Sequence, residues 1–380
     1  MLPLSYALRN LGRRGVRTAL TLAGLALVTV LVILADGFSR GLAHTAARTA
    51  SPDVVVLVGA EQEWDLVRSF IGEGHARAAA AGLPGVAVLD GRRAVSVELH
   101  VATRRGDQVG LLRGVEPEAF LVHPRVTLVE GVEPAGEREL LAGRLAESRM
   151  GLAPGALAVG SSIELEGVAW KVVGRFAAPG TVLEAELWAR LRDVMAATRR
   201  VDVSCVAARL EDPERLEEVA VWAARNKVAY EVSVKTEPEL YAGLSEALAP
   251  VTLLARIMAW LVLAGGVLAL ANTMFASVLA RTREMGTLRA VGYGPLAVGV
   301  SLLQEALLLA ALGGLVGYAV AGLFGEVPMK FPMGAFYLDL SAPVRLMGLG
   351  AALLAGVLGG LLPAWRAVRM PLVDALGDKL

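Results

Sequence analysis

The apolar residues of this chain gather into four long stretches, and a region of mixed composition lies between the first two. A transmembrane helix needs about 20 consecutive, mostly apolar residues to cross a hydrocarbon core about 30 Å thick. Residues 18–36, 251–280, 296–323 and 342–363 approach or exceed that length. The pattern therefore predicts an α-helical membrane protein with four transmembrane helices and a large domain, residues 37–250, inserted between helices 1 and 2.

The first stretch also has the basic flank of a secretory signal peptide. The apolar core of such a peptide is about 7–15 residues long and ends at a small-residue cleavage site of the A-x-A type. The apolar run at 18–35 is longer than this, and no A-x-A sequence closes it. A retained membrane helix is the better interpretation.

Basic residues flank the four stretches unevenly. Loops on the cytoplasmic side of a membrane carry an excess of Lys and Arg. The short segment before the fourth stretch has only Lys330 near its middle and Arg345 at its far edge. We therefore expect residues 37–250 and 324–341 to be extracytoplasmic, residues 281–295 and both termini to be cytoplasmic, and the protein to lie in the cytoplasmic (inner) membrane. The basic residues of the cytoplasmic segments are Arg9, Arg13, Arg14, Arg17, Arg281, Arg283, Arg289, Arg366, Arg369 and Lys379.

The two terminal segments are short. In residues 1–17, Leu4, Leu8 and Leu11 recur at helical spacing with arginines off that face. Two interpretations stay open: an amphipathic helix on the inner leaflet, or a basic flank that only sets the topology. Residues 364–380 are expected to form a cytoplasmic tail.

The large region alternates between strand-like and helix-like segments separated by Gly- and Pro-containing turns, which predicts an α+β domain. Residues 201–205 alternate apolar and polar side chains, the pattern of a half-buried strand. Asp212 followed by Pro213 is typical of a helix start. The expected strands are 53–58, 86–89, 94–102, 108–114, 161–165, 170–176, 201–210 and 228–234, and the expected helices are 61–81, 140–150, 182–197 and 213–226.

The order of these segments suggests how the domain is organised. The opening and closing elements could pair in one α+β unit, with residues 124–198 inserted between its halves. Residues 237–256 are expected to form a helix that runs directly into the second span. No Gly/Ser-rich linker separates the domain from the membrane.

Composition supports the membrane assignment and narrows the function. The chain is 55% hydrophobic and 19% charged, against about 45–50% and about 25% in soluble proteins. Its formal net charge of zero gives no reason to expect nucleic-acid binding. Cys205 is the only cysteine, so no intramolecular disulfide can form.

The sequence lacks the motifs of common catalytic and cofactor sites. It contains no H-E-x-x-H or C-x-x-C metal motif, no G-x-S-x-G nucleophile and no G-x-x-x-x-G-K-[ST] phosphate loop. We therefore expect a non-catalytic chain that binds no metal or cofactor of its own.

Polar side chains inside the spans gather toward the predicted cytoplasmic ends, apart from Thr29. They form no stripe that could line a water-filled path. Gln304 and Glu305 are the most polar of the third span, with Glu305 roughly 13 Å into it at 1.5 Å per residue. Either Glu305 pairs with an arginine of the central loop or of a partner helix, or it reaches the interface, ionised or protonated.

Small residues recur at four-residue spacing in the last two spans. The pairs are Gly313 with Gly317 and Gly356 with Gly360. Such spacing allows two helices to approach closely.

The central loop is the most distinctive charged segment between the spans. Its sequence R-T-R-E-M-G-T-L-R-A-V-G contains the pattern E-x-G-x-L-R-A-x-G. A short helix lying across the inner surface, turned back by Gly292, Gly294 and Pro295, is the expected structure. A compact charged loop of this kind is where a soluble partner would bind. The pattern is set by Glu284, Gly286, Leu288, Arg289 and Gly292, and Arg281 and Arg283 precede it.

This loop, followed by the Gln304–Glu305–Ala306 segment, resembles the FtsX-like permease domain of ABC transporters. The tail G-G-L-L-P-A-W-R-A-V-R-M-P-L-V-D-A-L is similar to the ending of the same family. The segment from G-R-L-A-E-S-R-M-G-L-A-P-G to K-V-V-G-R-F resembles the periplasmic core domain of MacB-like permeases. The order of one span, a large domain and three spans is also that of the family.

The resemblance implies a dimer of permease subunits, made with a second copy or a paralogous chain, together with an ABC ATPase. Since only seventeen residues precede the first span, the ATPase is expected to be a separate polypeptide that binds ATP and Mg²⁺. The loop residues named above would then couple ATP hydrolysis to motion of the extracytoplasmic domain. Membrane lipids and an envelope adaptor protein are further expected partners.

The family exports or extracts several kinds of envelope substrate, including lipoproteins, lipids, peptides and drugs, and the sequence does not choose between them. A different class of function also stays open, namely a membrane-anchored scaffold or regulator of envelope or cell-wall factors without transport. The E-x-G-x-L-R-A-x-G loop favours the permease, because a scaffold has no need of a docking helix inside the cell.

Overall fold

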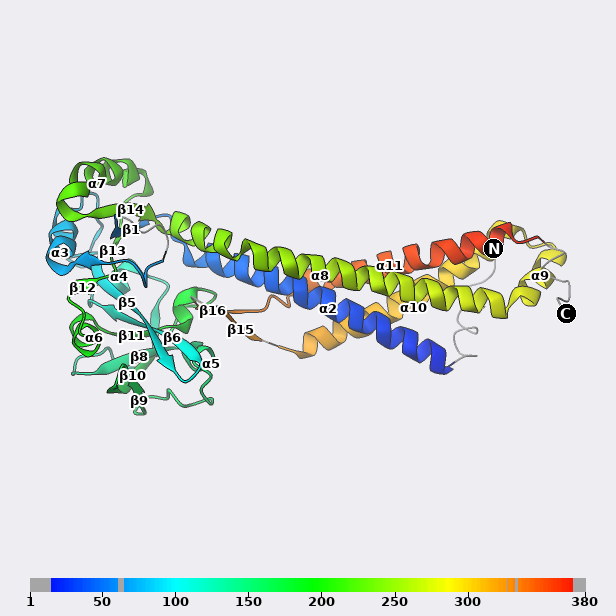
Figure 1. The fold of residues 1–380 in the computed structure, drawn as a ribbon, viewed down its shortest axis with the longest axis horizontal. Coiled ribbons are helices and arrows are strands. Elements are labelled where there is room, and N and C mark those ends of the chain that lie inside the picture. The colour runs from blue at the N-terminus through cyan, green and yellow to red at the C-terminus, as the bar shows by residue number, and fades with distance from the viewer. Residues whose placement is uncertain (1–14, 61–64, 326, 332–333, 372–380) are drawn as a thin grey trace. The chain divides into compact units, whose positions relative to one another are not determined.

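The computed structural model describes residues 15–60, 65–325, 327–331 and 334–371 (Figure 1). The amphipathic pattern of Leu4, Leu8 and Leu11 and the basic residue Lys379 lie outside the described residues. The chain divides into two compact units, which we describe separately. The membrane unit comprises the described parts of residues 1–40, 250–327 and 338–380, and the large domain comprises those of residues 41–249 and 328–337.

Among the described residues, four helices are long and apolar enough to cross a membrane. The prediction of four transmembrane helices is therefore supported by the structure. Two of the helices continue from the membrane unit into the large domain, and the second of them is unbroken from Glu237, as the sequence predicted. The helices of this unit are α2 (Gly15–Thr49), α8 (Glu237–Ala280), α9 (Thr282–Ala290), α10 (Pro295–Leu323) and α11 (Ala342–Arg369).

Glycines set the spacing between the spans. A Cβ atom on Gly356 would lie 2.6 Å from the Cβ of Ala310, and one on Gly317 would lie 2.6 Å from the Cβ of Thr29. Both distances are too short for real side chains, so α11 can pack on α10, and α10 on α2, only with glycine there. The close helix approach predicted from the glycine spacing is confirmed.

The large domain is built on a mixed sheet. Within the described residues this sheet has ten strands in the order β14-β1-β13-β5-β6-β11-β8-β10-β7, with β9 paired to β10. Most neighbours are antiparallel, whereas β6 with β11 and β8 with β10 are parallel. The strands are β1 (Val54–Gly59), β5 (Val95–Arg105), β6 (Gln108–Val115), β7 (Thr127–Gly131), β8 (Glu139–Gly143), β9 (Ser162–Leu165), β10 (Val168–Ala177), β11 (Leu187–Arg190), β13 (Cys205–Arg209) and β14 (Val232–Thr236).

The two faces of the sheet have different partners. Because side chains alternate along a strand, Val97 and Leu99 point to one face and Glu98 and His100 to the other. The first face packs on three helices in one hydrophobic core. The second face packs on a short helix and on the first turns of α8. The helices are α3 (Glu73–Gly82), α6 (Leu191–Thr198) and α7 (Leu216–Tyr230) on the first face and α4 (Ala119–Val122) on the second.

The predicted insertion corresponds to one end of the sheet. Strands β7 to β11, all within residues 127–190, lie next to one another in the sheet. The flanking strands β14, β1, β13, β5 and β6 form the other part. The two parts meet where β6 pairs with β11.

Three predicted helices of the large domain are wrong over part of their length. Residues 65–72 form turns and the short strand β2 (Ile71–Gly72), and residues 61–64 lie outside the described residues. Residues 139–143 and 187–190 are the central strands β8 and β11, followed by the short helices α5 (Ala146–Arg149) and α6. A central strand is buried on both faces and has no alternating pattern, so its apolar run cannot be told from a buried helix.

Two predicted strands also need correction. Residues 228–230 still belong to α7, and the next strand begins at Val232. Residues 205–208 are buried on both faces of the sheet, so the predicted half-buried strand is wrong about its exposure. The predicted helix start at Asp212 is confirmed as the cap of a short 3₁₀ helix, Pro213–Arg215, which leads into α7. The Asp212 side chain accepts a hydrogen bond from the Glu214 amide at 2.9 Å.

The segment between α10 and α11 is more ordered than the sequence suggested. It contains the hairpin β15 (Pro328–Phe331) and β16 (Gly334–Tyr337), which belongs to the large domain. Ala335 of this hairpin is buried with Leu145 and Ala185. The remaining short strands are β3 (Val88–Leu89) with β4 (Arg92–Arg93), and β12 (Asp202–Val203) with β2.

Candidate functional site

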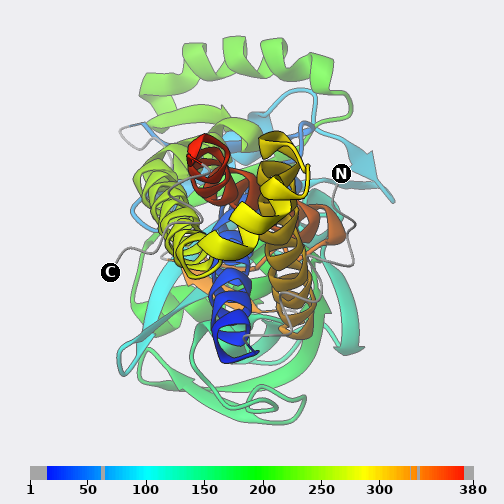
Figure 2. The ribbon, with the colours of Figure 1, turned by 90° about the vertical axis from the view of Figure 1, so that its right-hand side faces the viewer.

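The predicted coupling loop forms helix α9, which runs across one end of the bundle between α8 and α10 (Figure 2). Its inner side is fixed by apolar packing. Met285 and Gly286 are buried, and Met285 joins a cluster with Met274 of α8 and Val298 of α10. The helix is therefore seated on the ends of the spans.

A charged pair ties the start of α9 to the third span. One terminal nitrogen of Arg281 contacts Glu305 Oε2 at 3.0 Å, and the Nε of Arg281 contacts Glu284 Oε2 at 3.1 Å. The Arg281 and Glu305 side chains are only 10% and 9% exposed. Of the two alternatives for Glu305, the structure shows the pairing with an arginine of the loop. Gln304 beside it is half-buried.

The end of α9 has the geometry of a Schellman motif. The Gly292 amide donates to the Arg289 carbonyl, and the Tyr293 amide donates to the Leu288 carbonyl at 3.1 Å. Gly292 has a φ of +110°, a conformation that side-chain-bearing residues rarely adopt. Pro295 then begins α10 at its first position. The glycines and proline act as the turn that the sequence predicted.

Arg289 is an internal anchor, because its guanidinium donates to the carbonyl of Met370, just beyond α11. The outward side of α9 contains Arg283, Glu284 and Thr287, which are exposed. Leu288 is half-buried. The predicted coupling residues thus divide into an inner group that positions the helix and an outer group that a partner could reach.

Sequence reasoning missed two exposed apolar residues at this site. Val291 is 74% exposed and Tyr293 is 36% exposed. Both lie in the turn after α9, beside the charged residues that the motif emphasised. The sequence did contain a signal for this apolar surface, because an apolar residue stands on each side of Gly292 in an otherwise polar loop.

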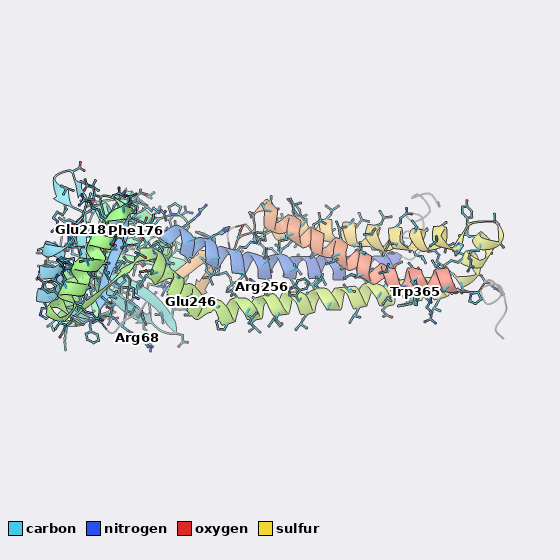
Figure 3. The ribbon with its side chains drawn as sticks, turned by 90° about the horizontal axis from the view of Figure 1, so that it is seen from above. Arg68, Phe176, Glu218, Glu246, Arg256 and Trp365 are labelled. Carbon is cyan, nitrogen blue, oxygen red and sulfur yellow. The ribbon has the colours of Figure 1, made fainter. Side chains whose placement is uncertain are left out.

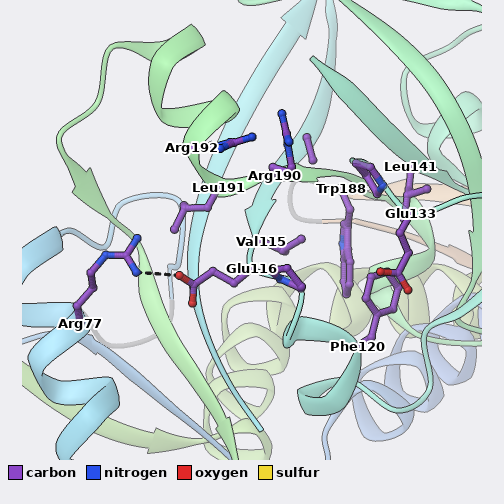
Figure 4. Close-up of a pocket in the computed structure, with 13 residues that line it drawn as sticks. Arg77, Val115, Glu116, Phe120, Glu133, Leu141, Trp188, Arg190, Leu191 and Arg192 are labelled. Carbon is purple, nitrogen blue, oxygen red and sulfur yellow. Dashed lines mark hydrogen bonds and ion pairs between the residues drawn. The ribbon is translucent and has the colours of Figure 1, made fainter. Parts of the chain in front are cut away.

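A second candidate is a cavity of about 300 Å³ in the large domain, where β6 and β11 end side by side (Figure 4). Trp188 and Phe120 line it, with ring centroids 5.6 Å apart. Two of its three arginines are engaged in close ion pairs: Arg77 with Glu116 at 3.0 Å, and Arg190 with a neighbouring aspartate at 2.9 Å. The cavity is small and mostly apolar, and its rim has charged side chains of both signs.

The donor atoms of Glu98, His100 and Cys205 lie within 4.8 Å of one another and are the group best placed to hold a metal ion in the described part of the chain. The chemistry does not fit a metal centre. Both Glu98 oxygens are engaged, one by Arg113 at 3.0 Å and one by His123 at 3.1 Å. Burial also raises the pKa of the Cys205 thiol, whereas metal binding requires the thiolate.

Family comparisons agree with this arrangement. The model of the MacB-like periplasmic core domain matches residues 18–224, more than half of the chain. The model of the FtsX-like permease C-terminal domain matches residues 256–372. The chain belongs to the MacB-like and FtsX-like family of ABC transporter permeases. It is therefore a membrane protein of the permease type, with a domain like those of MacB periplasmic regions inserted between its first two spans.

Individual relatives are similar over part of their length. The permease is 38% identical over 128 residues to the macrolide export ATP-binding/permease protein MacB of Shewanella sp. (strain ANA-3), which covers 34% of this chain and 19% of that protein. It is 28% identical over 251 residues to the ABC transporter permease YvrN of Bacillus subtilis (strain 168), which covers 59% of each chain. It thus spans about a fifth of the MacB protein and about three fifths of YvrN.

A solved structure to which the chain shows similarity is the periplasmic region of MacB from Actinobacillus actinomycetemcomitans. It aligns with 52% of this chain and 95% of that chain, at 8% identity and a TM-score of 0.37.

Proposed function

We propose that this permease is the transmembrane subunit through which an ATP-binding partner drives motion of the large domain. The partner would bind ATP and Mg²⁺, while this chain binds neither. The observation that carries the proposal is the two-sided construction of α9. Its inner side is anchored to three spans, so a force applied to its outer side would reach all of them.

The outer side of α9 suits a soluble partner. Arg283 and Glu284 supply opposite charges, and Val291 and Tyr293 supply exposed apolar surface in the following turn. Interfaces combine apolar anchors with charged groups that guide orientation. This surface supports docking of the ATPase at the cytoplasmic side that the positive-inside rule predicts.

A second permease subunit is the other expected partner. A groove of about 770 Å³ runs between α2 and α8, lined by residues such as Leu20, Leu27 and Gly266. These two spans are also less covered by protein than α10 and α11. Small residues and open apolar surface favour helix packing in a membrane, so we propose that a second copy or a paralogous chain packs here.

Transport through the spans receives little support from their polar groups. The buried Thr29 donates to the Leu25 carbonyl of its own helix at 2.8 Å, and Glu305 is engaged by Arg281. We therefore propose mechanotransmission, in which motion of the large domain exports or extracts an envelope substrate such as a lipoprotein, lipid, peptide or drug.

The test is purification of the tagged full chain from its native membranes in mild detergent, scored for a co-purifying ATPase. We expect near-equal amounts of ATPase and permease, and at least a tenfold loss of binding in Arg283→Glu. Glu246→Lys, a charge reversal at an exposed site of α8 (Figure 3), is the matched control and should bind normally. Absence of any ATPase in several detergents would favour a scaffold without transport.

A further inference from the structure

The second face of the sheet contains a cluster of ionisable side chains that the coupling site does not use. Arg113, Glu98 and Glu186 have side chains that are only 4%, 1% and 3% exposed. Charged side chains are rarely buried to this degree unless they are paired. Removing these charges from water costs free energy. The contacts that compensate for this cost show which elements the cluster joins.

Arg113 is the centre of the cluster. Its guanidinium contacts both oxygens of Glu186 at 2.8 Å and Glu98 Oε2 at 3.0 Å. Trp188 donates to Glu186 at 2.8 Å, and its ring lies 5.5 Å from the guanidinium carbon. Burial lowers the pKa of Arg113, but Glu186 and Glu98 outweigh this and raise it. The arginine is a permanent cation that joins β5 and β6 to Glu186, the residue just before β11.

His123 extends the cluster to the start of α8. Its Nε2 lies 3.1 Å from Glu98 Oε1, and its Nδ1 lies 3.7 Å from Glu237 Oε1. Glu237 is the first residue of α8, and its other carboxyl oxygen accepts a hydrogen bond from the Ser51 amide at 2.9 Å. The first residue of α8 is thus linked to the sheet and to the chain that follows α2.

These contacts differ from the apolar packing around them. Tyr241 and Leu240 of α8 also pack into the large domain, but apolar contacts are non-directional and define a position less sharply than hydrogen bonds do. The hydrogen bond from the Ser51 amide and the close contact with His123 are directional, and a displacement of the first turn would leave the buried Glu237 carboxyl group without these partners. The first turn of α8 is therefore held at a defined position on the sheet.

We propose that Arg113, His123 and Glu237 are positioning residues that fix the first turn of α8 to the sheet, so that the helix and the sheet move together. The role of this attachment in coupling rests on the proposed function, since α8 is the helix that leads from the large domain to α9. Its structural part, the fixed attachment, can be tested without the ATPase.

The protonation of Glu237 provides the readout. Burial raises its pKa to about 7, although His123, the Ser51 amide and Arg113 act in the opposite direction. Once the first turn detaches, Glu237 regains its ordinary pKa of about 4.5. The attached state therefore binds the proton more tightly, and detachment becomes easier as pH rises from about 4.5 through about 7. The ionisable groups near Glu237 are Glu98 of β5, Arg113 of β6, His123 after α4, Cys205 of β13 and Tyr241 of α8 itself.

The experiment is amide hydrogen exchange of the full chain in lipid nanodiscs at pH 5 and pH 8, with rates corrected for intrinsic exchange. We expect exchange in residues 237–249 to rise on the order of tenfold or more between these pH values, since the proton linkage acts on local opening. In Glu237→Gln, which keeps the shape but cannot ionise, this rise should disappear. Glu246→Gln, on an exposed site of the same helix, should retain it.

The outcomes separate this inference from the proposed function. An equal rise in wild type and in Glu237→Gln would overturn the inference, and so would pH-independent exchange in the wild-type chain, which needs no variant to fold. A rise that is lost only in Glu237→Gln supports it. If that result appears in a chain to which no ATPase binds, the attachment stands and the proposed function fails.

Discussion

Two groups in this permease each join one arginine to two glutamates, but their surroundings differ. Arg281 at the start of α9 contacts Glu284 and Glu305, and the Glu284 side chain is 48% exposed. Arg113 in the large domain contacts Glu98 and Glu186, all at most 4% exposed. The contact with the half-exposed Glu284 is screened by solvent and contributes little to stability. Buried pairs are costly to break, so they fix internal positions.

The largest expected effect comes from removing the buried cation. Arg113→Met leaves Glu98 and Glu186 inside the domain without the guanidinium that pairs with both, which is expected to cost about 3–5 kcal/mol of unfolding free energy. Thermal unfolding of the full chain in detergent measures the loss. Arg77→Met removes an arginine whose side chain is 53% exposed and should change stability little. Similar losses in both variants would contradict the distinction between the two kinds of pair.

Substituting Glu98 and Glu186 tests whether unpaired negative charge causes the loss of stability in Arg113→Met. Adding Glu98→Gln and Glu186→Gln to Arg113→Met removes the unpaired charges as well, so part of the lost stability should return. If the triple variant is as unstable as Arg113→Met, the loss comes from packing of the arginine stem and not from charge.

The sequence predicted much of the membrane unit because one strong signal, a long apolar run, determines each span. The glycine spacing of α10 and α11 similarly predicted close packing. The central strands β8 and β11 were predicted as helices, because burial on both faces removes the alternation that identifies a strand. Their identity depends on neighbours up to 75 residues away, such as Leu112 opposite Leu187.

The two charged groups also differ in how well the sequence revealed them. The α9 residues lie within one short motif, so the sequence could predict them together, and Glu305 was predicted as a possible partner. The buried cluster draws Glu98, Arg113, His123, Glu186 and Glu237 from five separate segments. A lone histidine or glutamate in a strand carries no signal of its own, and only the sheet order brings these residues together.

Acid should destabilise the large domain through the buried group. Burial raises the pKa of Glu98, but Arg113 and His123 outweigh it and lower the pKa to about 2. The native carboxylate therefore contributes stability above about pH 4.5, and about 3 kcal/mol is expected to be lost as pH falls from 4.5 toward 2. Unfolding measured across this range should show a weaker pH dependence in Glu98→Gln. An unchanged slope would remove Glu98 as the responsible group.

The group at the start of α9 should be less sensitive, because Arg281 still has a second carboxylate partner, Glu284, when Glu305 is changed. Glu305→Gln leaves Arg281 with Glu284 alone, and about 1–2 kcal/mol of stability is expected to be lost because a hydrogen bond to a charged group is weakened. The expected consequence is lower stimulation of ATP hydrolysis with only a small change in thermal unfolding. Gln304→Ala, at a half-buried neighbour, serves as the control. A stability loss as large as that of Arg113→Met would mean that Arg281, like Arg113, mainly fixes an internal position.

The smallest expected effect tests whether backbone, and not charge, places α9. Gly292 and Gly294 both have open space where a Cβ would project, but φ is +110° at Gly292 and −63° at Gly294. Gly292→Ala should therefore cost about 1 kcal/mol through backbone strain alone, while Gly294→Ala should be close to neutral. ATPase binding in the two variants is the measurement. A loss of ATPase binding in Gly292→Ala alone means that the Schellman turn orients the outer side of α9 for its partner. Equal binding by the two variants means that Arg281 and Arg289 orient α9 instead.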